Sequence, residues 1–330
     1  MNSLLSIKDL HVSFGLGSET VDAVRGINLE IARGEIVGIV GESGSGKSAS
    51  MLSVMRLLAT TATTRGTVHF AGKELFSASS KEMREIRGGK IGMIFQDPMT
   101  SLNPSFRIGS QIAEAIIRHQ HVSTKIAVSK ATDLLEVVSI PRPSESLSLF
   151  PHEMSGGMKQ RVMIAMAIAN DPELLIADEP TTALDVTIQA QILEVLKGLR
   201  ETRNLSIVII THDLGVVAGL ADSVNVMYAG EIVESGDVEG VFYNATHPYS
   251  RGLLSCVPRL DIRESALHPI GGDPPKLSEK TPGCSFQPRC KNAIDLCETT
   301  SPTLRSSTVT GLKVSCHNPM ELSPQMSESI

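Results

Sequence analysis

The chain has 330 residues, of which 41% are hydrophobic and 20% are charged, an ordinary balance for a folded protein with a substantial core. Its net charge of -6 and isoelectric point near 5.9 lack the basic excess of nucleic-acid-binding proteins, so we expect no nucleic-acid partner. No apolar run approaches the roughly twenty residues of a membrane-spanning helix, and the N-terminus lacks the apolar stretch of a signal peptide. The sequence therefore predicts a cytosolic protein that reaches a membrane only through partners.

The first third of the chain is predicted to form strands on either side of a glycine loop. Alternating apolar residues predict two strands of an antiparallel ribbon, at 5–14 and 23–31. A β-branched run at 35–40 predicts a buried strand, and apolar residues at helical spacing predict a helix from Ser48 to Leu58. The elements expected next are a threonine-rich linker at 60–64, a strand at 67–71, a charged helix at 81–87 and a strand at 91–95.

The apolar periodicity changes in the middle of the chain. Between 97 and 170 the spacing is helical throughout, which predicts an inserted helical subdomain. Strands are expected again at 174–177, 207–210 and 224–228, with an amphipathic helix at 188–199 between the first two. This alternation of strand and helix predicts a largely parallel sheet with helices on both faces.

The loop from Gly41 to Ser48 matches the pattern Gly-x-x-x-x-Gly-Lys-Ser between a predicted strand and a predicted helix. Its glycines allow successive N–H groups to face a phosphate, its lysine can reach the outer phosphates, and its last serine can ligate Mg²⁺. The predicted nucleotide-binding residues here are Gly41, Ser43, Gly44, Ser45, Gly46, Lys47 and Ser48. This loop predicts a nucleoside triphosphate ligand, and by itself leaves kinases, GTPases, helicases and transport ATPases open.

A second group of candidate residues lies at predicted strand ends, where ligands bind in open α/β sheets. Asp178 is placed to hold Mg²⁺ through water or Ser48, and Glu179 to take a proton from an attacking water. Gln96 can touch Mg²⁺ and the water, and His212 can donate to the γ-phosphate. The alternative for Asp178 and Glu179 is a solvated acidic turn at the end of the strand. For Gln96 and His212 it is an ordinary surface residue, which a single glutamine or histidine more often is.

Ser155, Gly156 and Gly157 precede a predicted helix and form a second anion site at a helix N-terminus. The phosphate loop at Gly41 already serves one nucleotide. The second site is therefore useful only to a nucleotide held by another chain.

With these motifs in this order, the chain resembles an ATP-binding cassette subunit over about residues 4 to 250. The only departure is Met154, where the signature commonly has leucine, a near-isosteric change. The resemblance assigns Gly41–Ser48 to the Walker A loop, Gln96 to the Q-loop, Ser155–Gln160 to the signature, Leu174–Glu179 to the Walker B strand, Ala183–Asp185 to the D-loop, His212 to the switch histidine and Phe14 to the aromatic that stacks on adenine.

Three further segments, Phe95–Pro104, Ala177–Gln191 and His247–Leu254, resemble the dipeptide and oligopeptide importer subfamily of these ATPases. The resemblance implies a pair of ATPases, often unlike, beneath two membrane permeases at the cytoplasmic face of the inner membrane, with an extracytoplasmic protein delivering peptide. ATP binding would close the pair, with Ser155 and its glycines completing the partner's site, and Asp185 is also expected at the nucleotide. Sibling importers move nickel, glutathione or antimicrobial peptides. A DNA-repair ATPase, the rival from another class, would carry long coiled coils, and sustained heptads are missing here.

These patterns together predict an α/β P-loop ATPase with an antiparallel β subdomain and a small Cys-rich extension. We expect the nucleotide-binding core at 1–96 and 171–235 and the helical subdomain at 97–170. The composition then shifts to Pro, Gly, Ser and Cys, which predicts the extension at 236–317 and a disordered tail at 318–330.

Four cysteines of the extension, Cys284, Cys290, Cys297 and Cys316, are predicted to bind one metal centre together. The segment has few apolar side chains and cannot readily hold a fold alone, and a reducing compartment disfavours disulfides. Zinc and iron suit four thiolates about equally on chemical grounds. Resemblance to the peptide-importer extension favours a [4Fe-4S] cluster over zinc. Cys256 lies outside the group and is expected to be buried.

Overall fold

The computed structural model describes residues 3–16, 19–97, 101–182, 184–256, 270–275, 281–307 and 311–321. It consists of two compact units, each assembled from segments far apart in the sequence. The first unit comprises Met1–Leu4, Ile31–Ile36 and Ala71–Ile210, and the second comprises Leu5–Glu30, Val37–Phe70 and Thr211–Ile330. Both units draw on the predicted nucleotide-binding core, so the domain borders expected from the sequence stay a prediction.

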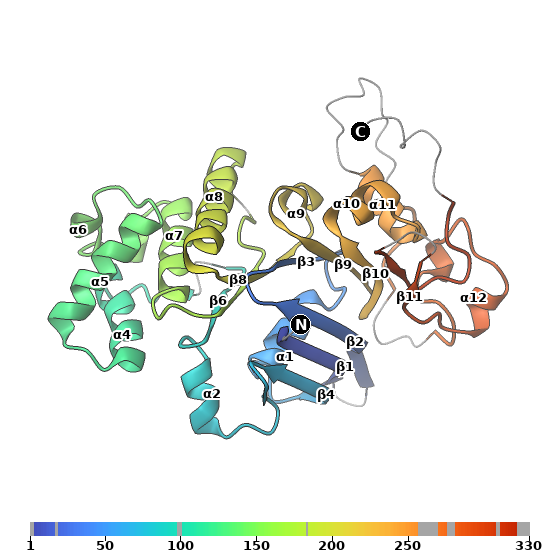
Figure 1. The fold of residues 1–330 in the computed structure, drawn as a ribbon, viewed down its shortest axis with the longest axis horizontal. Helices are drawn as coiled ribbons and strands as arrows, with labels where there is room; N and C mark the ends of the chain where they lie inside the picture. The colour runs from blue at the N-terminus through green and yellow to red at the C-terminus, as the bar shows by residue number, and fades with distance from the viewer. Residues whose placement is uncertain are drawn as a thin grey trace. The chain divides into compact units, whose positions relative to one another are not determined.

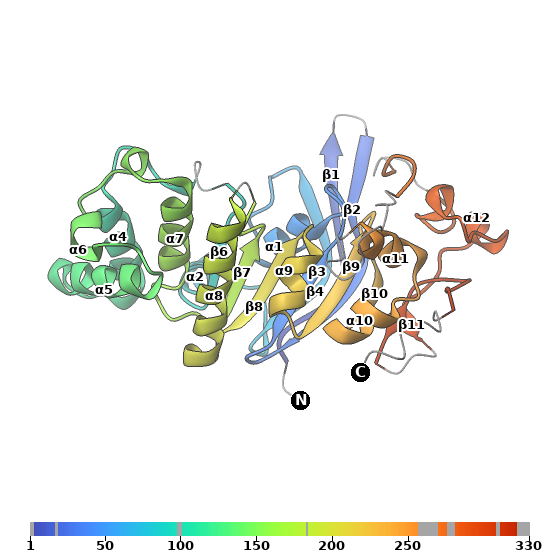
Figure 2. The same ribbon diagram turned by 90° about the horizontal axis from the view of Figure 1, so that it is seen from above.

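The second unit contains the predicted N-terminal ribbon. Strand β1 (Ser3–Leu16) lies between β2 (Glu19–Ala32) and β4 (Ala62–Phe70), as Figures 1 and 2 show. β1 and β4 are antiparallel, with Leu5 opposite Phe70. Strand β4 starts at Ala62, so the predicted linker at 60–64 is wrong in its second half, because the β-branched threonines there pair with β1.

A short parallel pair in the second unit positions the phosphate loop. Strand β3 (Ile36–Val40), fully buried, runs parallel to β9 (Ser223–Tyr228), and β9 pairs antiparallel with β10 (Glu231–Asp237). Helix α1 (Lys47–Val54) follows the loop and ends four residues earlier than predicted, because Arg56 adopts a left-handed φ of 50°. Three further helices of the second unit are α9 (Leu214–Leu220), α10 (Val238–Asn244) and α11 (Pro248–Ser255).

The C-terminal extension adds two strands to this sheet. Strand β12 (Lys313–Val314) pairs antiparallel with β10, and β11 (Arg305–Ser306) pairs with β12. A 3-10 turn η2 (Gln287–Arg289) and a short helix α12 (Leu296–Thr299) lie between the paired segments in sequence. At the start of the predicted disordered tail, the side-chain amides of Asn318 and Asn292 each donate to the backbone carbonyl oxygen of the other residue, while 322–330 lie outside the described residues.

The first unit contains three neighbouring parallel strands. β7 (Leu174–Asp178) pairs in parallel with both β6 (Ile91–Ile94) and β8 (Ser206–Thr211), and every residue of β7 is buried. The predicted strands at 91–95 and 207–210, which lie on either side of the strand that carries the acidic pair, are thereby confirmed. The other elements here are β5 (Lys73–Glu74), α2 (Ser80–Ile86) and α8 (Val186–Arg203).

The predicted helical stretch is confirmed, since all regular structure in the described residues 101–170 is helical. Its elements are α4 (Ile108–Gln120), α5 (Thr124–Val137), α6 (Pro143–Ser146), the 3-10 turn η1 (Pro151–Glu153) and α7 (Gly156–Ala167), which gather in one group in Figure 1. Buried residues at helical spacing, among them Ile112, Ile116 and Leu135, form their common core. In the part of the chain that the structure describes, no helix is both long enough and apolar enough to cross a membrane.

Candidate functional site

The phosphate loop begins where buried strand β3 ends, and its shape depends on glycine. Gly41, Gly44 and Gly46 have φ angles of 153°, 78° and 99°, a region that other residues rarely adopt. A side chain at Gly41 would place its Cβ 2.1 Å from the Met227 carbonyl oxygen, and one at Gly46 would lie 2.2 Å from that of Ala23. The loop therefore lies close against two neighbouring strands and tolerates only glycine at these two positions.

Lys47 and the start of helix α1 face the inside of this loop. The Lys47 side chain is buried, and its ammonium donates hydrogen bonds of 2.8 Å to the carbonyl oxygens of Gly41 and Glu42. Gly46 is the N-cap residue of α1 in a left-handed conformation and supplies no side-chain cap to the first turn. A helix N-terminus with this arrangement presents N–H groups and a cation to an anion, and Ser48 follows in the first turn.

Two further predicted residues, Phe14 and His212, belong to the same unit. Phe14 is half-buried on β1, opposite Ala62 of β4. His212 is exposed and follows directly after strand β8. Both positions leave the side chains accessible, and their contact with a nucleotide stays a prediction.

The predicted acidic pair lies at the end of β7 in the first unit. Asp178, the last residue of the strand, is buried, whereas Glu179 is partly exposed and has a left-handed φ of 46°. Such a backbone conformation is costly for a residue other than glycine and occurs most often at functional sites. The Glu179 N–H donates to the Ile210 carbonyl oxygen at 2.8 Å, which fixes the turn.

The structure brings two of the predicted catalytic residues into direct contact. The Gln96 side-chain amide donates to the Glu179 carboxylate at 2.9 Å, and the Thr182 hydroxyl donates to the same oxygen at 2.8 Å. Sequence reasoning did not single out Thr182, although it follows the acidic pair by three residues in a turn. These two donors orient the carboxylate that was predicted to accept a proton from water.

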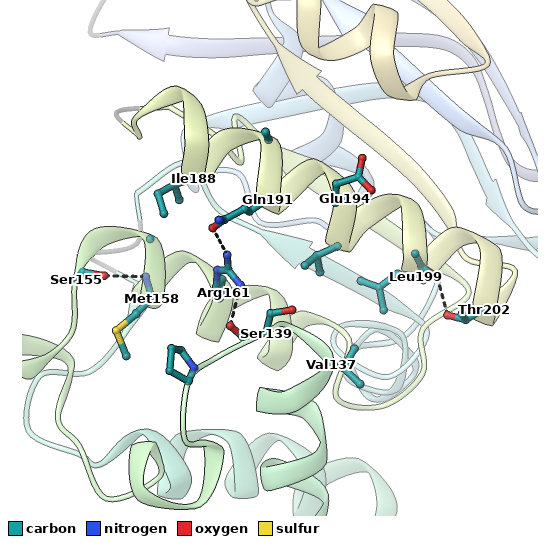
Figure 3. Close-up of a pocket in the computed structure, with 15 residues that line it drawn as sticks. Val137, Ser139, Ser155, Met158, Arg161, Ile188, Gln191, Glu194, Leu199 and Thr202 are labelled. Carbon is teal, nitrogen blue, oxygen red and sulfur yellow. Dashed lines mark hydrogen bonds between the residues drawn. The ribbon is translucent and has the colours of Figure 1, made fainter.

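The second predicted anion site, at the start of α7, is built differently. The Ser155 hydroxyl oxygen accepts a hydrogen bond from the Met158 N–H and caps the helix (Figure 3). A Cβ on Gly157 would lie 2.7 Å from Cγ2 of Ile188, so glycine here allows α7 to pack closely on α8. Ser155 and Gly157 lie at one end of a hollow of about 980 Å³ that α7 and α8 border.

Two family models match the chain: "ABC transporter" over residues 24–182, and "Oligopeptide/dipeptide transporter, C-terminal region" over residues 233–297. The chain is 50% identical to the dipeptide transport ATP-binding protein DppD of Bacillus subtilis, over 94% of each chain. It is 47% identical to the oligopeptide transport ATP-binding protein OppD of Escherichia coli, over 97% of this chain and 94% of that one.

The chain belongs to the ABC transporter ATP-binding protein family. A dimeric, post-hydrolysis structure of the ATP-binding cassette MJ0796 with ADP and phosphate matches with a TM-score of 0.64 and 29% identity, covering 71% of this chain and 98% of that one. The predicted fold class and the identification as an ABC-type ATPase are thereby confirmed.

In this ATP-binding protein, Asp185 is an N-cap residue. Its carboxylate accepts a hydrogen bond of 2.9 Å from the Ile188 N–H and caps α8, while the side chain stays exposed. The sequence had predicted only a contact between Asp185 and the nucleotide. The signal for the cap was an aspartate placed directly before a helical apolar pattern.

Arg161 was not selected from the sequence, yet it joins three segments around the signature helix. Its guanidinium donates to the Val138 carbonyl oxygen at 2.9 Å. It also donates to the Ser139 carbonyl oxygen at 2.9 Å and to the Gln191 side chain at 2.6 Å (Figure 3). Gln191 lies on α8, so this arginine holds α7, α8 and the turn after α5 together. Its position six residues after Ser155, on the helix that Ser155 caps, was the available signal.

The four cysteines of the extension lie in one region of the second unit. The Cys284 N–H donates to the Cys297 carbonyl oxygen at 2.8 Å. Burial raises the pKa of the Cys284 thiol to about 11, with smaller contributions from the neighbouring thiols of Cys297, Cys316 and Cys290. Burial also raises the pKa of the Cys290 thiol, with a contribution from Cys297, and that of the Cys316 thiol, with contributions from Cys290 and Cys297. A cation would stabilise the deprotonated forms of these three thiols.

The arrangement of these thiols does not itself form a metal site. Among the described residues, no group of three or more His, Cys, Asp or Glu side chains is placed to hold a metal ion. All five cysteines are free, and Cys256 is exposed at the end of α11, so the expectation that it is buried was wrong. The [4Fe-4S] cluster therefore stays a prediction.

Proposed function

We propose that this chain is the ATP-hydrolysing subunit that powers import of dipeptides or oligopeptides through an ABC transporter. The observation that carries the proposal is identity of about half the residues, over almost the whole chain, to dipeptide and oligopeptide transport ATP-binding proteins. The match to the C-terminal region of oligopeptide and dipeptide transporters at residues 233–297 supports the same substrate class.

In the proposed reaction, the phosphate loop binds ATP through its N–H groups, and the Lys47 ammonium neutralises the outer phosphates. Asp178 and Ser48 are the residues that would hold Mg²⁺, and the ion would neutralise negative charge on the phosphates. The Glu179 carboxylate, oriented by Gln96, accepts the proton of the attacking water. His212 donates to the γ-phosphate, and Phe14 stacks on the adenine.

We further propose that the complete transporter contains a second ATPase subunit and two permeases, with a binding protein that delivers peptide from outside. Ser155, Gly156 and Gly157 then complete the nucleotide site of the second ATPase, because their own chain already holds its nucleotide at Gly41. The chain would be peripheral, held at the cytoplasmic face of the inner membrane by the permeases.

Reconstitution with the permeases and ATPase encoded beside this chain tests the substrate. Proteoliposomes that contain the complex and the cognate binding protein should take up labelled dipeptides or oligopeptides in an ATP-dependent manner. Variant complexes with Lys47→Ala in this chain are the control for uptake that does not need its ATP site. Uptake of nickel or glutathione in place of peptides would contradict the proposed substrate class.

For the four cysteines, we propose a [4Fe-4S] cluster as their resident group. Cys297 and Cys316 are buried and Cys284 and Cys290 are partly buried. Burial raises the pKa values of the Cys284, Cys290 and Cys316 thiols, so their deprotonated forms need a compensating cation, which the cluster would supply. Protein purified without oxygen should be brown and contain about four irons and four sulfides per chain. The Cys297→Ser variant should lose the colour, while Cys256→Ser should keep it. A colourless wild-type protein with stoichiometric zinc would exclude the cluster.

A further inference from the structure

An arginine of the C-terminal extension contacts the phosphate loop directly. The Arg289 guanidinium forms two hydrogen bonds with the Glu42 carboxylate, Nη1 to Oε2 at 2.7 Å and Nη2 to Oε1 at 3.0 Å. The Arg289 side chain is only 5% exposed and that of Glu42 26%. Such a bidentate ion pair, largely removed from water, is among the stronger polar contacts that proteins form. Loss of one partner leaves the other charge without a counter-charge.

The surroundings of Arg289 hold it in one orientation. Its Nε donates to the Gly271 carbonyl oxygen at 3.0 Å, and its guanidinium lies 5.8 Å from the ring centre of Tyr228 and 6.0 Å from that of Phe286. These ring contacts are favourable for a cation. Arg289 is therefore positioned by Gly271 and Phe286 of the extension and by Tyr228 of β9, and Glu42 is its acidic partner.

Glu42 is restrained at three of its groups. Besides the carboxylate bound by Arg289, its N–H donates to the Tyr249 hydroxyl at 2.9 Å and its carbonyl oxygen accepts from Lys47 at 2.8 Å. Tyr249 lies on α11 and packs its ring 4.5 Å from Tyr228 and 5.4 Å from Phe286. Two residues that follow the cassette in sequence thus bind the residue next to Gly41.

The extension also borders the outer side of the loop. Glu42, Ser43, Gly44 and Ser45 line a pocket of about 220 Å³ together with Tyr228, Ala229, Pro274 and Pro275. The segment that contains the two prolines is the same one whose Gly271 carbonyl binds Arg289. One face of the loop is therefore bounded by the C-terminal part of the chain.

We propose that Arg289 is a positioning residue for the phosphate loop, which it holds in its ATP-binding shape through Glu42 while masking the Glu42 charge. A glycine-rich loop loses much conformational entropy when it orders around a ligand, and a loop that is already held loses less. An unmasked carboxylate at position 42 would also repel the phosphates of ATP. The inference rests on the proposed function, namely that the loop 41–48 binds ATP.

The test is equilibrium binding of a fluorescent ATP analogue with Mg²⁺ to the full-length chain, with thermal unfolding measured on each sample. Arg289→Gln should weaken binding by about tenfold, because Glu42 is left as an unmasked and unrestrained anion. The double variant Glu42→Gln, Arg289→Gln should bind at least about threefold more tightly than Arg289→Gln alone, because the repelling charge is gone. A merely structural role would give the double variant no such recovery.

Matched variants separate this inference from the proposed function. Arg251→Gln removes another arginine of the C-terminal part, which donates to the Ala245 carbonyl oxygen, and should leave ATP affinity unchanged. Lys47→Ala should lose binding, and normal binding by it would refute the ATP assignment of the loop together with the role of Arg289. If Lys47→Ala loses binding while Arg289→Gln keeps wild-type affinity, the positioning role alone is refuted. Should Arg289→Gln not fold, Arg289→Lys, which keeps the charge but cannot form the bidentate contact, must bind more weakly than wild type, and equal affinity would refute the role.

Discussion

Helices α1 and α7 both begin with a glycine-rich turn, but their first turns are built in opposite ways. At α1, Gly46 has a φ of 99°, and its carbonyl oxygen accepts from the Ser50 N–H at 2.9 Å, but it has no side chain to cap the N–H groups of the first turn. At α7, Ser155 is an extended N-cap residue whose hydroxyl oxygen accepts from the Met158 N–H.

Because of this difference, we expect the N-termini of α1 and α7 to have different roles. Under the proposed function, the α1 terminus would bind phosphates through its left-handed glycine backbone and its buried lysine, which belong to one unit. The α7 terminus is an ordinary capped helix whose serine is engaged within the chain. Under the same proposal, it would add contacts to a nucleotide that another subunit holds.

The largest effect is expected from a methyl group at the α1 terminus. Gly46→Ala forces a left-handed residue and a Cβ 2.2 Å from the Ala23 carbonyl oxygen, so the free energy of unfolding should fall by about 3 kcal/mol or more and ATP binding should be lost. Gly156→Ala is the matched control, since its Cβ would meet nothing closer than 3.9 Å. Denaturant unfolding and nucleotide titration measure both. Equal losses in the two variants would contradict the comparison.

The next variant separates nucleotide binding from hydrolysis. Glu179→Gln keeps a partner for Gln96 and Thr182 but removes the proton acceptor, so hydrolysis should slow by about 10²-fold or more while ATP affinity stays the same. Single-turnover hydrolysis by the assembled transporter is the measurement, with Glu173→Gln, a residue that pairs with Arg33, as the control. A rate within a few-fold of wild type would show that Glu179 is not the base.

A third helix N-terminus allows a test by pH. His247 caps α11 by accepting from the Tyr249 N–H, and burial lowers its pKa to about 3. The pKa of His247 in the unfolded chain is near 6.5, so between about pH 3 and pH 6.5 the unfolded chain binds more protons than the folded chain. The stability that the neutral, buried His247 contributes is therefore present above pH 6.5 and is lost as the pH falls. Between pH 7 and pH 5, wild type should lose about 2 kcal/mol more unfolding free energy than His247→Asn, which keeps a capping acceptor.

Comparing wild type with His247→Asn cancels the effect of a neighbouring carboxylate that also titrates. Glu234 accepts from the His247 N–H, and burial raises its pKa, so it titrates with the opposite sign in both proteins alike. Urea unfolding at several pH values gives the difference directly. Parallel curves for wild type and His247→Asn would show that His247 does not titrate as described.

The smallest effect concerns the α7 cap itself. Ser155→Ala should lower the free energy of unfolding by about 1 kcal/mol, and Ser155→Asn, which restores a capping oxygen, should recover most of that loss. If the site serves another subunit's nucleotide, neither variant changes ATP binding by the isolated chain, and both lower hydrolysis in the assembled transporter. Weaker ATP binding by isolated Ser155→Ala would instead place the serine at its own nucleotide.

The sequence predicted the residues of the phosphate loop and the acidic pair well because each motif is local and joins a strand to a turn. Gly41 and Asp178 lie where the strand pattern placed them, at the ends of β3 and β7. The left-handed backbone of Glu179 was not foreseen, because nothing in its neighbours demands it.

Contacts between distant segments were beyond sequence reasoning. Arg289 and Glu42 are 247 residues apart, and no periodicity relates them. Cys256 is a second example of this limit. It lies outside the group of four cysteines and was expected to be buried, but it is exposed at the end of α11.

The pairing of β12 with β10 has a consequence for how this protein stays soluble. An uncovered β10 would offer its backbone N–H and C=O groups to strands of other molecules, a common start of aggregation. The extension covers that side and ends the sheet with β11, only two residues long and exposed at Arg305 and Ser306. A protein shortened to end near 236, which would retain the cassette motifs, is therefore expected to precipitate at concentrations that the full chain tolerates.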